Sequence, residues 1–199
     1  MLVPNTFVAA LALLAAPVAG LSSAAISRFQ ATDLGTHRNA SVPKLVHAAA
    51  ITGGLLWTVY DDESLPMLNV TEAEGSNKTL ERRCGSNNVI CDYANYRANS
   101  PLCGILVSYF AEPDAVNWWA TSFTAQCMTA EELPSPEDRC CVSWPYRVTG
   151  LKVSMLWGAA APSRAKCTRD VLVSARATDV DLAGACTVQC MSNRPDGCY

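Results

Sequence analysis

The stretch Cys140-Cys141-Val142-Ser143-Trp144 places two adjacent cysteines at the start of a short apolar run. Successive side chains of a β-strand point to opposite faces of the sheet, so a strand here sends the two sulfurs in opposite directions. Each cysteine must then pair with a different partner. We therefore expect Cys140 and Cys141 to be the hub of a disulfide frame that runs from Cys84 to Cys198.

The cysteines define this frame by their number and position. An even number of cysteines in a short chain is typical of a disulfide framework formed in an oxidising compartment. The ten cysteines are Cys84, Cys91, Cys103, Cys127, Cys140, Cys141, Cys167, Cys186, Cys190 and Cys198. We expect five disulfides, and the sequence leaves their pairing open but excludes one pair. On a strand, Cys186 and Cys190 lie about 13 Å apart, which is beyond disulfide reach.

The N-terminus has the pattern of a secretory signal peptide. Residues 7–16 are an uninterrupted apolar run, and the small residues that follow offer cleavage sites between positions 19 and 25. We assign residues 1–20 to the signal, although the positive charges typical of its start are absent. A membrane-spanning helix needs about 20 apolar residues, and this run is shorter and is interrupted by Pro17. The sequence therefore predicts a secreted, extracellular protein without a stable membrane anchor.

Residues 21–83 contain no cysteine and differ in character from the rest of the chain. Three sequons for N-glycosylation, which agree with export, lie at Asn39, Asn69 and Asn77. The dibasic pair Arg82-Arg83 ends a polar stretch and is a candidate processing site, because proteases need exposed and flexible backbone; a charged linker is the alternative. We divide the mature chain into residues 21–83, a pro-region or a part of the fold, and a disulfide-rich domain over residues 84–199.

Apolar periodicity and turn residues predict an alternation of helices and strands. Ser100 as N-cap and Pro101 at the first helical position predict a helix over residues 100–110. A second helix is expected over residues 151–161, weakened by Gly158 and Pro162. Strands are expected at residues 55–60, 118–123, 140–148, 171–176 and 180–190. Because a strand needs a sheet to join, the strand expected at residues 55–60 favours residues 21–83 remaining part of the folded protein. The order favours an α+β fold, a small disulfide-stapled two-layer sandwich in which a mainly antiparallel sheet carries two helices on one face.

Charge and motif content exclude several function classes. The net charge of -3 and the pI of about 5.3 argue against a large basic surface and so against a nucleic-acid partner. His37 and His47 are the only histidines, and no GxSxG, HExxH or Cys-His signature occurs. The cysteines lack the short spacing of a zinc site. The acidic clusters at residues 61–63 and 179–181 are places to seek acid–base chemistry or calcium, but solvated turns are the simpler interpretation. We predict no catalytic residue, no metal and no cofactor, which favours a protein that is not an enzyme.

Aromatic residues give the better indication of binding. Trp118 and Trp119 are adjacent, so on a strand one should enter the core while the other is exposed. An exposed tryptophan can stack on a sugar ring, which makes this pair the candidate binding residues; burial of both is the alternative. Trp144 and Trp157 are assigned to the core.

Several segments resemble a known family of secreted proteins. They are Cys84-Gly85, the SPLCGIL helix with Cys103, the CCVSW run, and the tail from Leu182 to Cys198, which ends in the pattern CxxxCxSNRPxGC. Over residues 84–198 the chain resembles the cysteine-rich secreted proteins of filamentous fungi grouped as the WD-like domain family. The sequence has no repeat of propeller-blade length, and the resemblance implies no assigned activity. The order of elements is also similar to fungal necrosis-inducing effectors and killer-toxin-like proteins, which is a likeness of architecture only.

These observations lead to three hypotheses of different classes. The first is a secreted, disulfide-stabilised, non-enzymatic interaction protein, effector-like or toxin-like. We expect it to act as a monomer on an extracellular protein or glycan of a host or competitor. The second is a structural or carbohydrate-binding protein of the cell wall, and the third is a hydrolase of unfamiliar type. We favour the first because export, the cysteines and the missing catalytic motifs all agree with it.

Overall fold

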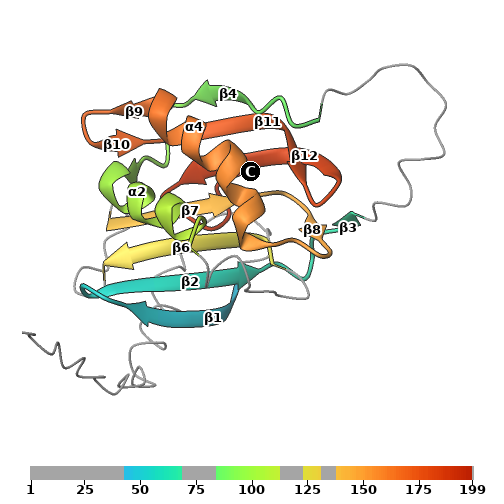
Figure 1. The fold of residues 1–199 in the computed structure, drawn as a ribbon, viewed down its shortest axis with the longest axis horizontal. Coiled ribbons are helices and arrows are strands. Elements are labelled where there is room, and N and C mark those ends of the chain that lie inside the picture. The colour runs from blue at the N-terminus through green and yellow to red at the C-terminus, as the bar shows by residue number, and fades with distance from the viewer. Residues whose placement is uncertain (1–42, 69–83, 113–122, 131–137, 199) are drawn as a thin grey trace, which may run out of the picture.

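A seven-stranded antiparallel sheet forms the centre of the fold in the computed structural model of the protein, which describes residues 43–68, 84–112, 123–130 and 138–198 (Figure 1). Its strands follow the order β1-β2-β6-β7-β12-β11-β4. They are β1 Lys44–Ile51, β2 Leu55–Asp61, β4 Asn88–Cys91, β6 Ala125–Ala130, β7 Arg139–Ser143, β11 Ala175–Leu182 and β12 Ala185–Ser192. Every neighbouring pair of strands is antiparallel. Because β7 is the middle strand of this order, the adjacent cysteines lie at the centre of the sheet.

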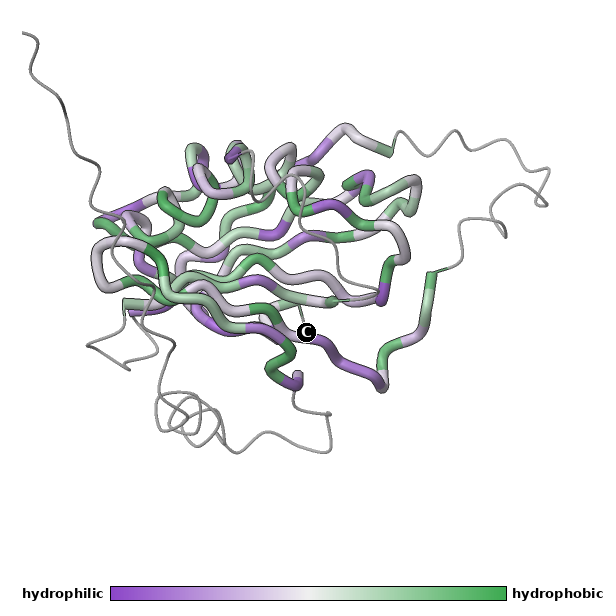
Figure 2. Tube along the Cα trace, turned by 60° about the horizontal axis from the view of Figure 1, so that its bottom comes forward, coloured by the Kyte–Doolittle hydropathy of each residue, from purple (hydrophilic) through white to green (hydrophobic). Residues whose placement is uncertain are grey.

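Two helices cover one face of the sheet, α2 (Ser100–Tyr109) and α4 (Trp157–Cys167), and the short 3₁₀ helix η3 (Val153–Leu156) leads into α4. Figure 2 shows them as a second layer against the sheet. The main hydrophobic core fills the space between the layers and includes Trp57, Leu102, Leu106, Met128, Val142, Leu156, Ala160 and Met191. The predicted fold class, a mainly antiparallel sheet with two helices on one face, is therefore confirmed.

The N-terminal hairpin is part of this sheet. β2 pairs with β1 on one side and with β6 on the other, and Gly53 and Gly54, both at positive φ, form the turn between β1 and β2. The strand predicted at residues 55–60 is present as β2, and its Trp57 and Val59 side chains are buried in the main core. One sheet thus contains strands from both sides of the division proposed at residue 84. Proteolytic cleavage at that division stays a prediction.

The helix predicted over residues 100–110 is confirmed as α2, but its cap is Asn99 and not Ser100. The Asn99 side-chain oxygen accepts a hydrogen bond from the Leu102 N–H at 3.1 Å. Ser100 is buried, and its hydroxyl shares a hydrogen bond of 2.8 Å with the Thr168 hydroxyl. Asparagine and serine are about equally good caps. Local preference therefore could not show which of the two residues caps the helix. The contact with Thr168 occupies the Ser100 hydroxyl and leaves Asn99 as the cap.

The second helix lies further along the chain than predicted. η3 (Val153–Leu156) occupies the middle of the expected range, and α4 continues to Cys167, so that Pro162 lies inside the helix. Pro162 lacks the N–H that would bond the Gly158 carbonyl four residues earlier. The Asn87 side chain donates a hydrogen bond from Nδ2 to that carbonyl at 3.1 Å. A residue outside the helix thus replaces the bond that proline removes.

Replacing Asn87 should therefore destabilise the protein through the unpaired Gly158 carbonyl. We expect Asn87→Gly to lower the free energy of unfolding by about 1 kcal/mol, the usual net contribution of one hydrogen bond. Asn87→Ala should lower it by about 1 kcal/mol more, because Asn87 has a φ of 49°, where alanine is strained and glycine is not. Chemical denaturation with the disulfides intact measures both values. An alanine variant more stable than the glycine variant would contradict this explanation.

The structure differs from several of the strand predictions. β6 was not predicted, because its sequence AQCMTA has few β-branched and no aromatic residues; pairing with β2 and β7 makes it a strand. The strand predicted at residues 180–190 is interrupted by a turn at Ala183 and Gly184, both at positive φ. The strand predicted at residues 171–176 is divided between β10 (Leu172–Val173) and β11. The strand predicted at residues 118–123 lies outside the described residues except for Phe123.

Two small sheets flank the main one. β10 lies between β5 (Ala98–Asn99) and β9 (Thr168–Arg169), and β3 (Met67–Leu68) pairs in parallel with β8 (Arg147–Val148). The strand predicted at residues 140–148 is thus β7, a bend and then β8. In β8, the Arg147 Nη2 atom lies 2.8 Å from a carboxylate oxygen of the buried Asp61. This ion pair ties the end of β2 to the segment that follows β7.

Candidate functional site

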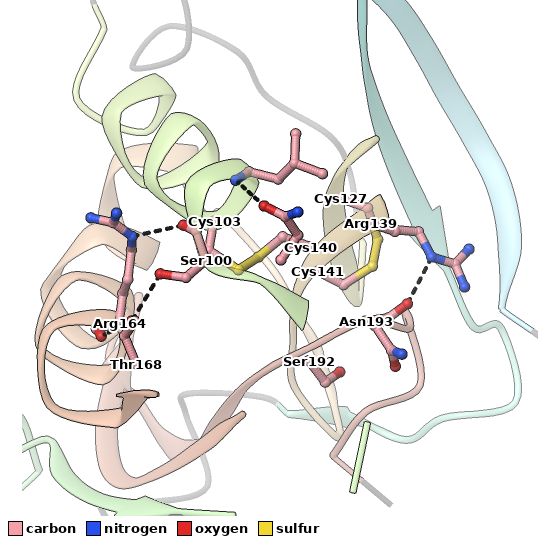
Figure 3. Close-up of a disulfide and its surroundings, with 12 residues drawn as sticks. Ser100, Cys103, Cys127, Arg139, Cys140, Cys141, Arg164, Thr168, Ser192 and Asn193 are labelled. Carbon is pink, nitrogen blue, oxygen red and sulfur yellow. Dashed lines mark hydrogen bonds between the residues drawn. A yellow bond between two sulfur atoms is a disulfide. The ribbon is translucent and has the colours of Figure 1, made fainter. Parts of the chain in front are cut away.

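The sulfurs of Cys140 and Cys141 leave β7 on opposite faces, as predicted (Figure 3). Cys140 points to the helices and bonds to Cys103 in α2, with the two Cα atoms 5.1 Å apart. Cys141 points away from the helices and bonds to Cys127, which is its direct neighbour in register on β6. All four cysteines are fully buried. The adjacent pair therefore joins the central strand to the helical layer on one face and to the next strand on the other.

Two further disulfides complete the frame. Cys91 in β4 bonds to Cys167, the last residue of α4. Cys190 in β12 bonds to Cys198 in the C-terminal tail. Cys186 lies on the same extended strand as Cys190, and the two do not pair with each other, as predicted. Four of the five expected bridges are thus present.

The sheet face that Cys141 occupies, here called the outer face, can be followed across three strands. Residues directly opposite each other in register share a face. Ser143 lies on the Cys141 side of β7 and is opposite Cys190 on β12, and Cys190 is opposite Arg176 on β11. These side chains therefore point away from the helices.

An open pocket of about 400 Å³ lies on the outer face, between the β11–β12 hairpin and the bend after β7. Its lining residues are Pro145, Tyr146, Arg176, Thr178, Asp179, Cys186, Thr187, Val188 and Cys198. The Cys190–Cys198 disulfide holds the tail against this face, where the Cys198 sulfur lies 3.3 Å from the Ser143 carbonyl oxygen. Three segments that are far apart in the sequence thus form one fixed concave surface.

The pocket combines a cation, a carboxylate and an aromatic ring, which come from Arg176, Asp179 and Tyr146. Asp179 has a φ of 57° and lies where the register of β11 shifts between Ala177 and Val180. These groups can hydrogen-bond a polar ligand and pack against it. The carboxylate among the described lining residues is that of Asp179.

Cys84 and Cys186 are free thiols in this structure, and Cys186 lines the pocket. The Cys84 thiol donates a hydrogen bond to the Val180 carbonyl oxygen at 3.6 Å. Desolvation of the sulfur raises the pKa of Cys84 to about 12, together with the influence of the nearby Cys186 and Asp181 side chains. At neutral pH, Cys84 therefore remains protonated.

The pattern CxxxCxSNRPxGC has a structural explanation in the tail that closes the pocket. The Ser192 hydroxyl donates a hydrogen bond to the Arg194 carbonyl at 3.0 Å. The Arg194 guanidinium carbon lies 3.2 Å from the centroid of the Tyr96 ring. A Cβ atom at Gly197 would overlap the Ser192 hydroxyl. The pattern thus encodes a tight turn that Cys198 can close.

Several predicted site residues lie outside the described part of the chain and stay predictions. They are the signal peptide at residues 1–20, Asn39, Asn69, Asn77, Arg82, Arg83, Trp118 and Trp119. Trp144 is buried, as predicted, but Trp157 is 50% exposed, so its assignment to the core is wrong. The reason is that α4 begins at Trp157, and Leu156 takes the buried position facing the sheet.

The acidic clusters have structural roles. Asp61 pairs with Arg147, Asp62 accepts hydrogen bonds in the turn after β2, and Asp181 accepts one in the β11–β12 turn at 2.7 Å. Asp179 alone lines the pocket. Within residues 43–68, 84–112, 123–130 and 138–198, no group of three or more His, Cys, Asp or Glu is arranged to hold a metal ion. No helix of these residues has the length and apolar character needed to cross a bilayer.

Sequence reasoning misses the pocket itself. Tyr146 follows a proline in a bend, and Arg176 is one charged residue on an alternating strand, so neither has a local signal. The pairing of β7, β12 and β11 brings them together. The one available indication is the acidic cluster at residues 179–181, of which Asp179 lines the pocket.

Comparisons with known proteins give one match. The family model described as fungal WD-like matches residues 66–198, which include all ten cysteines and the pocket residues. The match begins before β3, and so it extends across the dibasic pair. Searches among curated proteins and among solved structures found no match.

Proposed function

We propose a function for this chain on the premise that it belongs to the fungal WD-like family, as the family match shows. In this proposal the protein is exported and acts outside the cell as a disulfide-stabilised interaction protein. It binds a host or competitor component, in the manner of an effector or toxin, and catalyses no reaction. Residues 1–20 direct export, and Asn39, Asn69 and Asn77 are the glycan acceptors.

The disulfide frame is the observation that carries this proposal. Four bridges join β4 to α4, α2 to β7, β6 to β7 and β12 to the tail. Most of the bonded cysteines are buried, so the bridges form as the chain folds. The cytosol keeps thiols reduced, whereas the secretory pathway oxidises them. A frame of this kind therefore supports folding during export and persistence in the medium.

The pocket on the outer face is the binding site in this proposal. Its wall contains the Cys198 bridge, so little conformational entropy is lost when a ligand binds. Arg176 and Asp179 present opposite charges at one concave surface, which suits a polar partner that carries both donors and acceptors, such as a peptide segment or a glycan.

Replacing Arg176 with alanine tests the pocket. Applied to susceptible leaf tissue or to a competing microbe, the oxidised secreted protein should produce a response. Arg176→Ala should raise the half-maximal concentration at least about tenfold, because a hydrogen bond to a charged group contributes about 1.5–3 kcal/mol. Arg169→Ala is the matched control, since Arg169 is exposed on β9 and does not line the pocket. Equal effects of the two variants, or a full response from reduced and alkylated protein, would count against the proposal.

A carbohydrate-binding role in the cell wall is the second candidate, and exposed aromatic rings favour it. Tyr146 is 38% exposed at the pocket, and Trp157 is 50% exposed at the start of α4. Such rings have an apolar face that can cover a sugar ring. The protein should then be retained by chitin or glucan, and Tyr146→Ala, Trp157→Ala, or replacement of Trp118 or Trp119 should release it. Absence of retention on both polysaccharides would rule this candidate out.

A further inference from the structure

Cys84 and Cys186 are the two cysteines that the four bridges leave unused, and they meet from distant parts of the chain. The residue after Cys84 donates its backbone N–H to the Asp179 carbonyl at 2.6 Å. Cys186 is opposite Asp181 in the register of β11 and β12. The Cys84 thiol donates to the Val180 carbonyl oxygen at 3.6 Å, between these two points, and Cys186 is near enough to raise the pKa of Cys84. The fold therefore brings the two thiols close together.

This pair differs from the four bridges in exposure. The cysteines with no exposed surface are Cys103, Cys127, Cys140, Cys141 and Cys167, and all of them are bonded. Cys84 is exposed, and Cys186 is partly exposed on the wall of the pocket. A small reagent can thus reach Cys84 and Cys186 in the folded protein, whereas the central bridges require the fold to open.

We propose that Cys84 and Cys186 form a redox-active dithiol site. An extracellular disulfide oxidant closes it to a fifth bridge, and a thiol reductant opens it again while the other four bridges stay intact. This site rests on the cysteine pair and does not depend on the binding function proposed above.

Closure proceeds by thiol–disulfide exchange with one external disulfide, such as glutathione disulfide. The Cys186 thiolate, reached through the pocket, attacks one sulfur of that disulfide, forms a mixed disulfide and releases one thiol. Cys84 then loses its proton, attacks the Cys186 sulfur and releases the second thiol. Two protein S–H bonds are replaced by one S–S bond, and the oxidant is reduced to two thiols.

The environment of Cys84 explains this order of steps. Desolvation, with the nearby Cys186 and Asp181 side chains, raises the pKa of Cys84 to about 12, which makes this thiol the weaker candidate for the first attack. When Cys186 becomes part of a mixed disulfide, its contribution to this raised pKa is removed. Deprotonation of Cys84 then becomes easier, so that it acts second. The product joins the turn at Cys84 to the β11–β12 hairpin and removes a thiol from the wall of the pocket.

Graded reduction of the native protein tests this site. The protein is equilibrated with glutathione disulfide, treated with increasing dithiothreitol, alkylated with iodoacetamide and digested without further reduction. Mass spectrometry should find a Cys84–Cys186 cross-link after oxidation. This cross-link should disappear at a dithiothreitol concentration at least about tenfold lower than the Cys103–Cys140 cross-link, because exposed bridges are more easily reduced.

The double variant Cys84→Ser and Cys186→Ser is the control. It should keep the other four bridges. The only difference from the wild-type protein should be that no Cys84–Cys186 cross-link is reduced at low dithiothreitol concentration. Three results with the wild-type protein would overturn the proposal: alkylation of both thiols after oxidation, pairing of either with another cysteine, or reduction in step with the buried bridges. The wild-type titration alone decides the question if the double variant does not fold.

Discussion

Removing the Cys103–Cys140 bridge by replacing both cysteines with alanine is expected to lower the free energy of unfolding by about 4 kcal/mol. The bridge joins residues 37 positions apart, and a disulfide stabilises a protein mainly by restricting its unfolded chain, the more so the longer the loop. It is also the bridge that ties α2 to the central strand. Equilibrium unfolding in guanidinium, with the remaining bridges intact, measures the loss.

The Cys190–Cys198 bridge is the matched comparison. It joins residues only 8 positions apart, so replacing both cysteines with alanine should lower the free energy of unfolding by about 2.5 kcal/mol. The smaller loop should therefore give the smaller loss, by about 1.5 kcal/mol. If the order of the two losses were reversed, loop closure would not be the dominant contribution, and native contacts of the tail would have to explain its stability.

The hub could be predicted from the sequence because it rests on strand geometry alone. Adjacent cysteines on a strand face opposite sides whatever the rest of the fold does. The partners could not be predicted in the same way. Cys127 pairs with Cys141 through the register of β6 and β7, and β6 has no strand signal of its own. A local pattern can show that two sulfurs diverge, but a distant pairing decides where each one goes.

The same distinction between local patterns and distant contacts explains why the second helix and the pocket were not predicted correctly. The proline inside α4 is a local stop signal, and the structure overrides it with Asn87, which lies outside the helix and pairs with the Gly158 carbonyl. The pocket depends on Tyr146, Arg176 and Cys198, which three separate segments bring together. Signals based on spacing cannot find sites of this kind, because these three residues are far apart in the sequence.

The frame does not cover the whole sheet. None of the four bridges reaches a residue before Cys91. β1 and β2 are held by their hydrogen bonds to each other and to β6, and by the Trp57 ring, which packs on Tyr109 with the centroids 5.0 Å apart. Cleavage after the predicted site at Arg83 would therefore leave this hairpin attached only by non-covalent contacts, so the disulfides would not prevent its loss.

Trp144, the last residue of the CCVSW stretch, shows how this part of the core is stabilised. Its side chain is 1% exposed and packs edge-to-face on Phe123, with the ring centroids 5.1 Å apart. Its backbone N–H donates to the Thr124 carbonyl at 3.0 Å. Its indole nitrogen, in contrast, is buried without a hydrogen-bond partner among the described residues. Because an unpaired buried N–H costs about 1–3 kcal/mol, packing and not polar contact must account for the stabilising effect of this ring.

Replacing Trp144 with alanine should therefore lower the free energy of unfolding by about 3–5 kcal/mol, the usual loss for a large buried aromatic side chain. Trp144→Phe should stay within about 1.5 kcal/mol of the wild type, because phenylalanine keeps a ring against Phe123 and removes the unpaired N–H. Chemical denaturation followed by circular dichroism, with all disulfides intact, measures both variants. Equal losses would contradict this account, since they would assign the stabilisation to the indole nitrogen and not to the packing of the ring.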